Sequence, residues 1–313
     1  MKGRMRRSAE DAWGGAGLKD IALPMAGPGR AAAYLELTKP RITVMALAAA
    51  MTGFYLATEG RLDFILAVHA MTATAMVAAG ASALNQVLER DADALMVRTR
   101  DRPLPAGRVS LSGSVAFGVG FSVMGLVYLG LSTNLLAGSL AALTVVLYVF
   151  VYTPLKRRTV FNTLVGAVPG ALPPMIGWAA ASGHLTWQGG AFFAILYVWQ
   201  IPHFSAIAWL YRDDYVRGGF KMVGSGDAEG VRTGRRILVE IAALVAVTLL
   251  PGLFGSAGLL YMMGAGTLGL LFWGFGLSTA GRRGASDVRR LVLVSVAYLP
   301  LLLAVMMLDK GLQ

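Results

Sequence analysis

The chain has no cysteine among its 313 residues. Disulfide bonds, thiolate nucleophiles and metal sites built on thiolates are therefore excluded. Histidine is scarce, and its three positions, His69, His184 and His203, are too scattered to predict a histidine metal cluster. Charged residues make up only 14% of the chain, whereas soluble domains carry about 25%. The hydrophobic fraction of 56% and the mean hydropathy of +0.62 indicate an integral membrane protein.

Apolar runs long enough to cross a bilayer, about 17–25 residues, recur along the sequence. They predict nine transmembrane helices, over residues 42–58, 64–88, 111–132, 134–154, 160–181, 187–211, 236–254, 256–278 and 289–309. Residues 1–33 are polar and glycine-rich, which predicts a mobile cytoplasmic tail. Residues 34–313 are expected to form a single transmembrane domain.

The basic residues alternate between the two sides of the predicted membrane. Of the 28 lysines and arginines, 26 fall in the N-terminal segment or in the loops after the second, fourth, sixth and eighth helices. Only Arg61 and Lys310 fall on the other side. By the positive-inside rule the N-terminus is cytoplasmic and, after nine spans, the C-terminus is outside. The net charge of +11 therefore reflects orientation, with some attraction to anionic membrane lipids, and no nucleic-acid partner is predicted.

A polar stripe follows the second apolar run. Asn85, Glu89 and Asp93 are spaced four residues apart, so on a helix they lie on one face. An arginine block of Arg98, Arg100 and Arg102 comes directly after them, and Pro103 ends any continuing helix.

A second charged cluster mirrors the first. It follows the sixth predicted helix and consists of Asp213, Asp214, Arg217 and Lys221. The four helices between the clusters indicate a weak internal duplication. The fifth helix contains Pro169, Pro173 and Pro174, so we expect it to be kinked and to lie inside the bundle.

Oxygen ligands beside a block of arginines suit an anion that is held through a divalent cation. Mg²⁺ prefers carboxylate, amide and water oxygens, and arginine forks suit phosphate. The chemistry favoured is ionisation of a diphosphate ester at the membrane surface. Asn85, Glu89, Asp93 and Asp214 are the candidate ligands, and Arg98, Arg102 and Lys221 are the candidate phosphate contacts.

Simpler interpretations exist for these residues. Charges at a cytoplasmic membrane face are often only solvated, and this alternative stays open for Asp213 and Asp214. It is disfavoured for the Asn85 stripe because a carboxylate stripe at a buried helix end destabilises a protein unless it is used. His203 lies beside Pro202 inside an apolar run. A packing residue, a ligand and a proton-transfer group are all compatible with that position.

Several strings resemble one known family. N-x-x-x-E-x-x-x-D, from Asn85 to Asp93, resembles the first acidic motif of the UbiA-type intramembrane prenyltransferases, and L-T-K-P-R before the first helix is similar to their lead-in segment. Four strings resemble the haem branch, the protohaem IX farnesyltransferases. They are D-x-x-M-x-R-T-x-x-R-P-L (Asp93 to Leu104), Y-T-P-L-K-R-R-T (Tyr152 to Thr159) followed by Asn162, P-H-F (Pro202 to Phe204) and D-Y-V-R-G-G-F-K-M (Asp214 to Met222). Two departures from the wider superfamily, Glu89 in place of aspartate and Gly218 four residues after Asp214, fit that branch.

The resemblance implies a fold, a reaction and a set of site residues. The fold would be a bundle of nine helices around a central cavity open to the cytoplasm, in a bacterial inner membrane. Farnesyl diphosphate would ionise over Mg²⁺ and alkylate a vinyl group of haem b, and water addition would give haem O. Asn85, Glu89, Asp93 and Asp214 would hold Mg²⁺; Arg98, Arg102, Lys221 and Lys156 would hold the diphosphate. His203 would contact haem, at iron or through a proton or water. The product would pass to a haem A synthase or to terminal oxidase assembly.

Three alternatives are compatible with parts of the sequence. A prenyltransferase of the same fold with a quinone precursor or chlorophyllide as acceptor is disfavoured by the Met96–Leu104 string and by P-H-F. A secondary transporter is disfavoured because the acidic residues lie at helix ends rather than at the bilayer midplane. A membrane scaffold or assembly protein is the third.

Overall fold

The computed structural model describes residues 29–312, with positions 225 and 228 left out. Within those residues, nine helical segments are long and apolar enough to cross a membrane, which confirms the predicted all-α class and the number of spans. Seven of them are single helices or continuous helical runs: α2 (Pro40–Ala57), α3 (Phe64–Leu95), α4 (Leu111–Ser132), α9 (Trp187–Leu210), α11 (Val231–Leu253), α12 (Leu259–Arg282) and α13 (Ala285–Leu312). The fourth span joins α5 (Leu135–Val145), η1 (Val146–Tyr152) and α6 (Thr153–Leu155), and the fifth joins α7 (Asn162–Ala171) and α8 (Pro173–Ser182).

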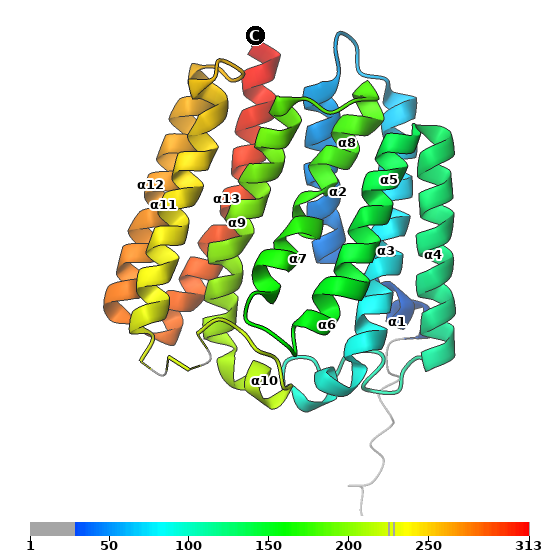
Figure 1. Cartoon of the computed structure of the whole chain (residues 1–313), viewed down its shortest axis with the longest axis vertical. Helices are drawn as coiled ribbons and strands as arrows, with labels where there is room; N and C mark the ends of the chain where they lie inside the picture. The colour runs from blue at the N-terminus through cyan, green and yellow to red at the C-terminus, as the bar shows by residue number, and fades with distance from the viewer. Residues whose placement is uncertain (1–28, 225, 228, 313) are drawn as a thin grey trace, which may run out of the picture.

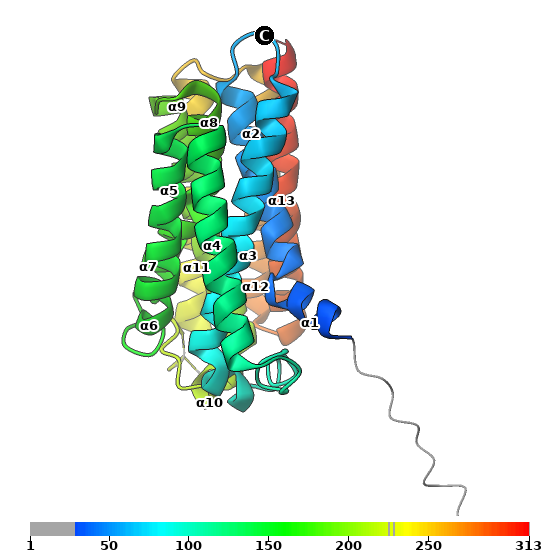
Figure 2. The ribbon, with the colours of Figure 1, turned by 90° about the vertical axis from the view of Figure 1, so that its right-hand side faces the viewer.

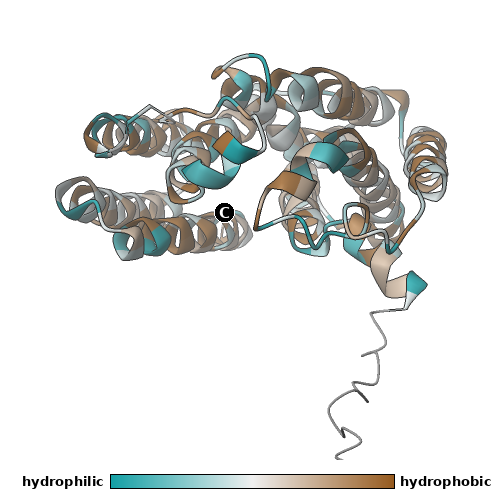
Figure 3. Cartoon of the chain, turned by 90° about the horizontal axis from the view of Figure 1, so that it is seen from below, coloured by the Kyte–Doolittle hydropathy of each residue, from teal (hydrophilic) through white to brown (hydrophobic). Residues whose placement is uncertain are grey.

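Two short helices, α1 (Arg30–Leu37) and α10 (Arg212–Arg217), lie at the lower end of the bundle, and the C-terminus lies at the upper end (Figure 1). Of the predicted mobile tail, residues 1–28 lie outside the described residues. The described part already begins α1 at Arg30, and Ala33 is fully buried. In Figure 3, seen from below, hydrophilic residues gather on the loops and short helices of this lower end.

The main difference from the predicted boundaries lies at α3. The helix ends at Leu95 rather than at residue 88, so the whole polar stripe is helical and lies within one rigid element. Helix α11 also begins earlier than predicted, at Val231 rather than 236.

The predicted kink in the fifth span is confirmed. The helix is interrupted at Leu172, between α7 and α8, because a proline ring removes a backbone donor and clashes with the preceding turn. An 18-residue window of this span is 61% buried, the largest share among the nine spans of the described residues. The two halves of the span therefore pack against different helices: α8 packs against α2, while α7 packs against η1 and α9.

Helices α2 and α8 approach closely enough for their backbones to touch. A Cβ atom on Gly53 would lie 2.0 Å from the carbonyl oxygen of Pro174, and one on Gly177 would lie 1.8 Å from that of Ala50. Glycine removes the side chain that would separate the helices, which is the usual way to obtain close packing in a membrane, where lipid is as apolar as the side chains. The contact fixes the upper half of the bundle around its centre.

Two hydrophobic cores flank this contact. One is formed mainly by α9, α11, α12 and α13 and includes Ile241 and Tyr261. The other is formed mainly by α2, α3, α4, α5 and α8 and includes Phe54 and Leu129. Figure 1 shows the first group on the left and α3, α4 and α5 on the right; in Figure 2, turned by 90°, α11 and α12 lie behind α3 and α4.

Two neighbouring charges on α13 cap the ends of other helices at the upper end. Lys310 Nζ donates to the carbonyl oxygens of Tyr55, Leu56 and Thr58, at 2.6, 2.9 and 2.7 Å, where α2 ends. Asp309 accepts from the N–H groups of Gly258 and Tyr261, at 2.6 and 3.0 Å, where α12 begins. A cation at free carbonyl groups and an anion at free N–H groups both match the helix dipole.

Candidate active site

The polar stripe of α3 is buried. Asn85 and Asp93 are fully buried and Glu89 is 5% exposed, as their shared helical face predicts. Buried carboxylates destabilise a fold unless cations or hydrogen bonds compensate them. The three side chains therefore indicate a site built to receive compensating groups.

Three cations from three separate segments meet this stripe. Lys39 Nζ lies 2.6 Å from Asn85 Oδ1. Lys156 Nζ lies 2.6 Å from Glu89 Oε1, and Arg102 Nη1 lies 2.7 Å from Asp93 Oδ2. We call the five charged residues of this group, Lys39, Glu89, Asp93, Arg102 and Lys156, the ion cluster.

Local structure places Lys39 and Lys156. Lys39 adopts the left-handed conformation (φ 50°), which is uncommon for a residue with a side chain, and Pro40 starts α2 directly after it. This turn between α1 and α2 aims Lys39 at α3. Lys156 follows α6, and its Nζ lies 4.6 Å from the centre of the Tyr152 ring.

The π-helix η1 supplies the remaining contacts of the stripe. Tyr148 Oη lies 3.3 Å from Lys39 Nζ, and Thr153 Oγ1 accepts a hydrogen bond of 2.9 Å from Asn85 Nδ2. A π-helix is rare and is often found at functional sites. Its wider turn changes the direction of the side chains in and after it. Here the Tyr148 hydroxyl contacts Lys39, and the hydroxyl of Thr153, the first residue of α6, contacts Asn85 on α3.

The ion cluster contains three cations and two carboxylates. Burial, together with the positive charges of Arg102 and Lys156, lowers the pKa of Lys39 to about 7, so the full positive charge of Lys39 depends on an anion bound beside it. Among the described residues, the buried Asp93 Oδ1 has no hydrogen-bond partner, and the buried Glu89 Oε1 has only its ion pair with Lys156. Excess positive charge and an unpartnered oxygen ligand together fit an anion that arrives with a metal ion.

The donor set fits Mg²⁺ in part. Glu89 and Asp93 offer carboxylate oxygens and Asn85 an amide oxygen, the donors that Mg²⁺ takes together with substrate phosphates and water. In residues 29–312 without 225 and 228, no group of three or more histidine, aspartate or glutamate side chains is arranged to hold a metal ion. A metal at α3 would therefore depend on ligands from the substrate.

The second charged cluster contacts the first through Asp214. Its Oδ1 accepts from the N–H of Val97 at 3.1 Å and its Oδ2 from the N–H of Arg98 at 3.2 Å, and Arg217 forms an ion pair with it. Although burial raises the pKa of Asp214, the hydrogen bonds from Arg217 and from these two N–H groups hold it below its usual value. Asp214 thus fixes the start of the α3–α4 loop, the loop that carries Arg102. Asp213 is exposed.

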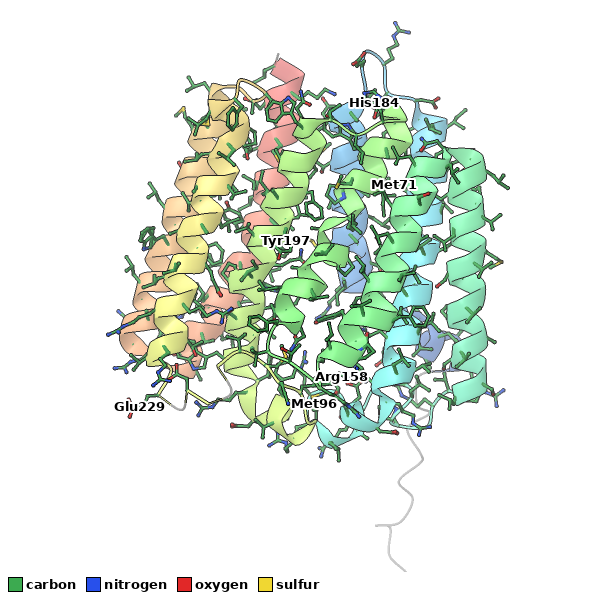
Figure 4. All side chains as sticks on the ribbon, viewed as in Figure 1. Met71, Met96, Arg158, His184, Tyr197 and Glu229 are labelled. Atoms are coloured by element: carbon green, nitrogen blue, oxygen red, sulfur yellow. The ribbon has the colours of Figure 1, made fainter. Side chains whose placement is uncertain are left out.

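A small hydrophobic cluster reinforces this contact. Met96, Ala92 and Phe220 are buried together with Ala208 and Met222, and Met96 lies at the lower end of the bundle in Figure 4. A Cβ atom on Gly218 would lie 3.0 Å from the Met96 side chain. Both charged motifs are therefore parts of one site rather than two separate ones.

The other predicted phosphate contacts point elsewhere. Arg98 is exposed, and its guanidinium carbon lies 4.9 Å from the centre of the Tyr211 ring and 5.6 Å from that of Tyr215. Arg100 and Lys221 are exposed. The backbone of Lys221 joins the site, because its N–H donates to the Lys156 carbonyl at 2.7 Å and its carbonyl accepts from Asn162 Nδ2 at 2.7 Å.

His203 lies on α9, partly buried against α13. Its Nδ1 is 2.6 Å from Ser295 Oγ, and its ring stacks on Trp199 at 5.0 Å. The Ser295 hydroxyl lies 2.7 Å from the Val292 carbonyl and can donate to it; in that arrangement the imidazole N–H is on Nδ1. The Nε2 atom then keeps its lone pair for a ligand or a proton.

Sequence reasoning assigned no role to Lys39, Tyr148 or Thr153. Lys39 is part of the L-T-K-P-R string, and a lysine directly before an N1 proline was the available signal. Thr153 is part of the Y-T-P-L-K-R-R-T string, which was its available signal. Tyr148 lies in an apolar run whose π-helical turn has no periodic signature in the sequence.

Comparisons with known proteins show the family of this chain. Residues 46–299 match the UbiA prenyltransferase family. A protoheme IX farnesyltransferase of Solibacter usitatus is 43% identical over 88% of this chain and 98% of its own length. One of Koribacter versatilis is 41% identical over 94% and 99%, respectively.

The fold has solved counterparts. A UbiA homologue from Aeropyrum pernix K1 superposes with a TM-score of 0.70 at 19% identity, covering 86% of this chain and 98% of that one. A UbiA homologue from Archaeoglobus fulgidus bound to DMAPP and Mg²⁺ gives 0.65 at 15% identity, covering 87% and 98%. Because the family match spans most of the helical bundle, this integral membrane chain belongs to the UbiA prenyltransferase family.

Proposed function

We propose that this enzyme transfers the farnesyl group of farnesyl diphosphate to a vinyl group of haem b, with addition of water, to give haem O and diphosphate. The proposal is carried by the buried ion cluster, which has more cations than carboxylates and so fits a diphosphate. The acceptor is proposed from the relatives named protoheme IX farnesyltransferase, which are 43% and 41% identical over nearly their whole lengths.

The residues in and around the ion cluster have separate proposed roles. Lys39, Arg102 and Lys156 bind the diphosphate, and they stabilise the negative charge that it gains as the farnesyl C1–O bond breaks. Tyr148 and Thr153 hold Lys39 and Asn85 in place. Asp214 positions the loop of Arg102 through the N–H groups of Val97 and Arg98. Arg98 and Lys221 are exposed and are proposed to join the phosphate only when the substrate is bound.

Mg²⁺ is the proposed cofactor, held by Asn85, Glu89 and Asp93. Asp214 is a further candidate ligand that would have to exchange its hydrogen bonds from Val97 and Arg98 for the metal. When bound, it would neutralise the diphosphate as a leaving group. The UbiA homologue from Archaeoglobus fulgidus with Mg²⁺ and DMAPP supports this assignment. The apolar helices around the site keep water from the farnesyl cation until the vinyl group has reacted.

The direct test uses the purified full-length chain in detergent or nanodiscs with haem b, farnesyl diphosphate and Mg²⁺. Mass spectrometry of the haem should show the mass of haem O. Release of diphosphate without a farnesylated haem, or farnesylation of a quinone precursor in place of haem, would contradict the proposed acceptor.

Replacement of Lys39 by methionine is expected to weaken substrate binding. Loss of one charge-assisted contact to phosphate should raise the KM for farnesyl diphosphate about 10- to 100-fold, with a smaller change in kcat. Arg41→Gln is the matched control, because Arg41 is exposed and two residues away. Equal KM values for the two variants would remove Lys39 from the diphosphate site.

Replacement of His203 by alanine is expected to change the absorption spectrum of bound haem b and to lower haem O formation. The KM for farnesyl diphosphate should stay within a few-fold, because His203 contacts Ser295 and Trp199 rather than the ion cluster. His69→Ala is the control, since His69 Nδ1 also lies 2.6 Å from a hydroxyl group, that of Tyr128. An unaltered haem spectrum combined with loss of diphosphate binding would assign His203 to the other substrate.

We also propose that the protein resides in a bacterial inner membrane with its N-terminus in the cytoplasm and its C-terminus in the periplasm. Alkaline phosphatase fused at Gln313 should be active, and fusions within 98–108 should be inactive. The opposite pattern would invert the orientation. The farnesyl chain keeps the product in the bilayer, where a haem A synthase or a terminal oxidase under assembly is the proposed recipient.

A further inference from the structure

A shallow groove lies along the exposed face of α12, a helix at the edge of the bundle in Figure 1. Its volume is about 560 Å³. All but one of its lining residues belong to α12: Thr267, Leu270, Leu271, Gly274, Phe275, Ser278 and Arg282, with Arg290 from α13.

The groove has the length and surface of an acyl-chain site. From Thr267 to Arg282 a helix rises about 22 Å, which is somewhat more than half of a hydrocarbon core of about 30 Å. Leu270 and Phe275 are exposed along it, at 69% and 41%. Gly274 leaves the middle open, because a Cβ atom there would meet nothing within 4 Å.

The lower end of the groove carries positive charge. Arg282 Nη1 lies 3.8 Å and Arg290 Nη1 lies 4.0 Å from the same oxygen of Asp287. These distances are too long for directed hydrogen bonds, and the arginine side chains are 70% and 64% exposed. Two guanidinium groups share one carboxylate, so most of their donors remain available for a phosphate group.

From this combination we propose that α12 binds one anionic phospholipid of the leaflet at the lower end. The phosphate lies between Arg282 and Arg290, and one acyl chain follows Gly274 toward Thr267. Free phosphate would not contact the apolar residues along the groove. A zwitterionic lipid would place the positive charge of its headgroup next to the two arginines. The proposal is independent of the proposed enzymatic function.

The first test compares two charge-matched double variants of the full-length chain in detergent. Phosphatidylglycerol is titrated, and native mass spectrometry counts the bound lipid. Arg282→Gln with Arg290→Gln should weaken binding at the tightest site about tenfold or more. Arg283→Gln with Arg289→Gln, which removes two exposed charges outside the groove, should change it less than about twofold. An equal loss of lipid binding in both double variants would show diffuse attraction of the lipid to positive charge, and would overturn the proposed site.

The second test keeps both arginines and fills the groove. Gly274→Leu should lose the tightly bound lipid, whereas Gly266→Leu should keep it, because both positions on α12 have open space for a side chain but only Gly274 lines the groove. Retention of the lipid in Gly274→Leu would overturn the acyl-chain site. Displacement of the lipid by equimolar inorganic phosphate, or equal binding of phosphatidylcholine, would overturn the phospholipid assignment.

Discussion

Replacement of Asp93 by asparagine is expected to lower farnesyl transfer about 100- to 1,000-fold, the range seen when one preorganised electrostatic contact of a transition state is lost. Asp93 is fully buried, pairs with Arg102 through Oδ2 and leaves Oδ1 without a partner. Asparagine keeps the volume but loses the charge, so both the cation contact and the proposed metal contact weaken. Activity is measured as haem O formed per minute, and circular dichroism checks that the helix content is unchanged.

Asp91→Asn is the matched control for this variant. Asp91 lies on the same helix two residues earlier, but its side chain is 79% exposed and pairs only with neighbouring Arg90. It should retain nearly full activity. Removal of divalent cations with EDTA should inactivate the wild type and the Asp91 variant alike. Unchanged turnover in Asp93→Asn, or full activity in EDTA, would contradict the assignment of the ion cluster as the reaction site.

Replacement of Gly177 by alanine is expected to disrupt the fold rather than the chemistry. The new Cβ atom would lie 1.8 Å from the Ala50 carbonyl oxygen, and backbone on both sides cannot rotate away as a side chain can. Alanine gains about 1 kcal/mol of helix propensity over glycine, but overpacking of this kind costs about 3 kcal/mol or more. The thermal midpoint for loss of the monodisperse peak in detergent should therefore fall clearly.

Gly190→Ala provides the comparison, because a Cβ atom at Gly190 would meet nothing within 4 Å. Its thermal midpoint should match that of the wild type or lie slightly above it. A Gly177→Ala protein as stable as the wild type would mean that α2 and α8 do not touch as the structure shows.

The sequence predicted the fold and the polar stripe because both depend on local periodicity. Long apolar runs gave the nine spans, and Pro173 gave the break in the fifth. The four-residue spacing placed Asn85, Glu89 and Asp93 on one face, and the structure shows all three buried on α3.

The partners of the stripe depend on contacts between distant segments. Lys39 reaches Asn85 across 46 positions, and the contact of Asp214 with Val97 spans 117. Contacts between residues so far apart along the chain cannot be recognised from a single sequence. The π-helical turn at Val146–Tyr152 likewise lies in an apolar run whose sequence pattern is that of an ordinary α-helix. The roles of Tyr148 and Thr153 were therefore not predicted.

The charges at Asp309 and Lys310 affect how the bundle can move. They join the ends of α2, α12 and α13 at the upper end, and the Gly53 and Gly177 contacts hold α2 against α8 in the same half. The lower half has longer loops, and the fifth span is interrupted at Leu172, between α7 and α8. We therefore expect the lower ends of the helices to move relative to one another more readily than the upper ends, which these contacts hold together.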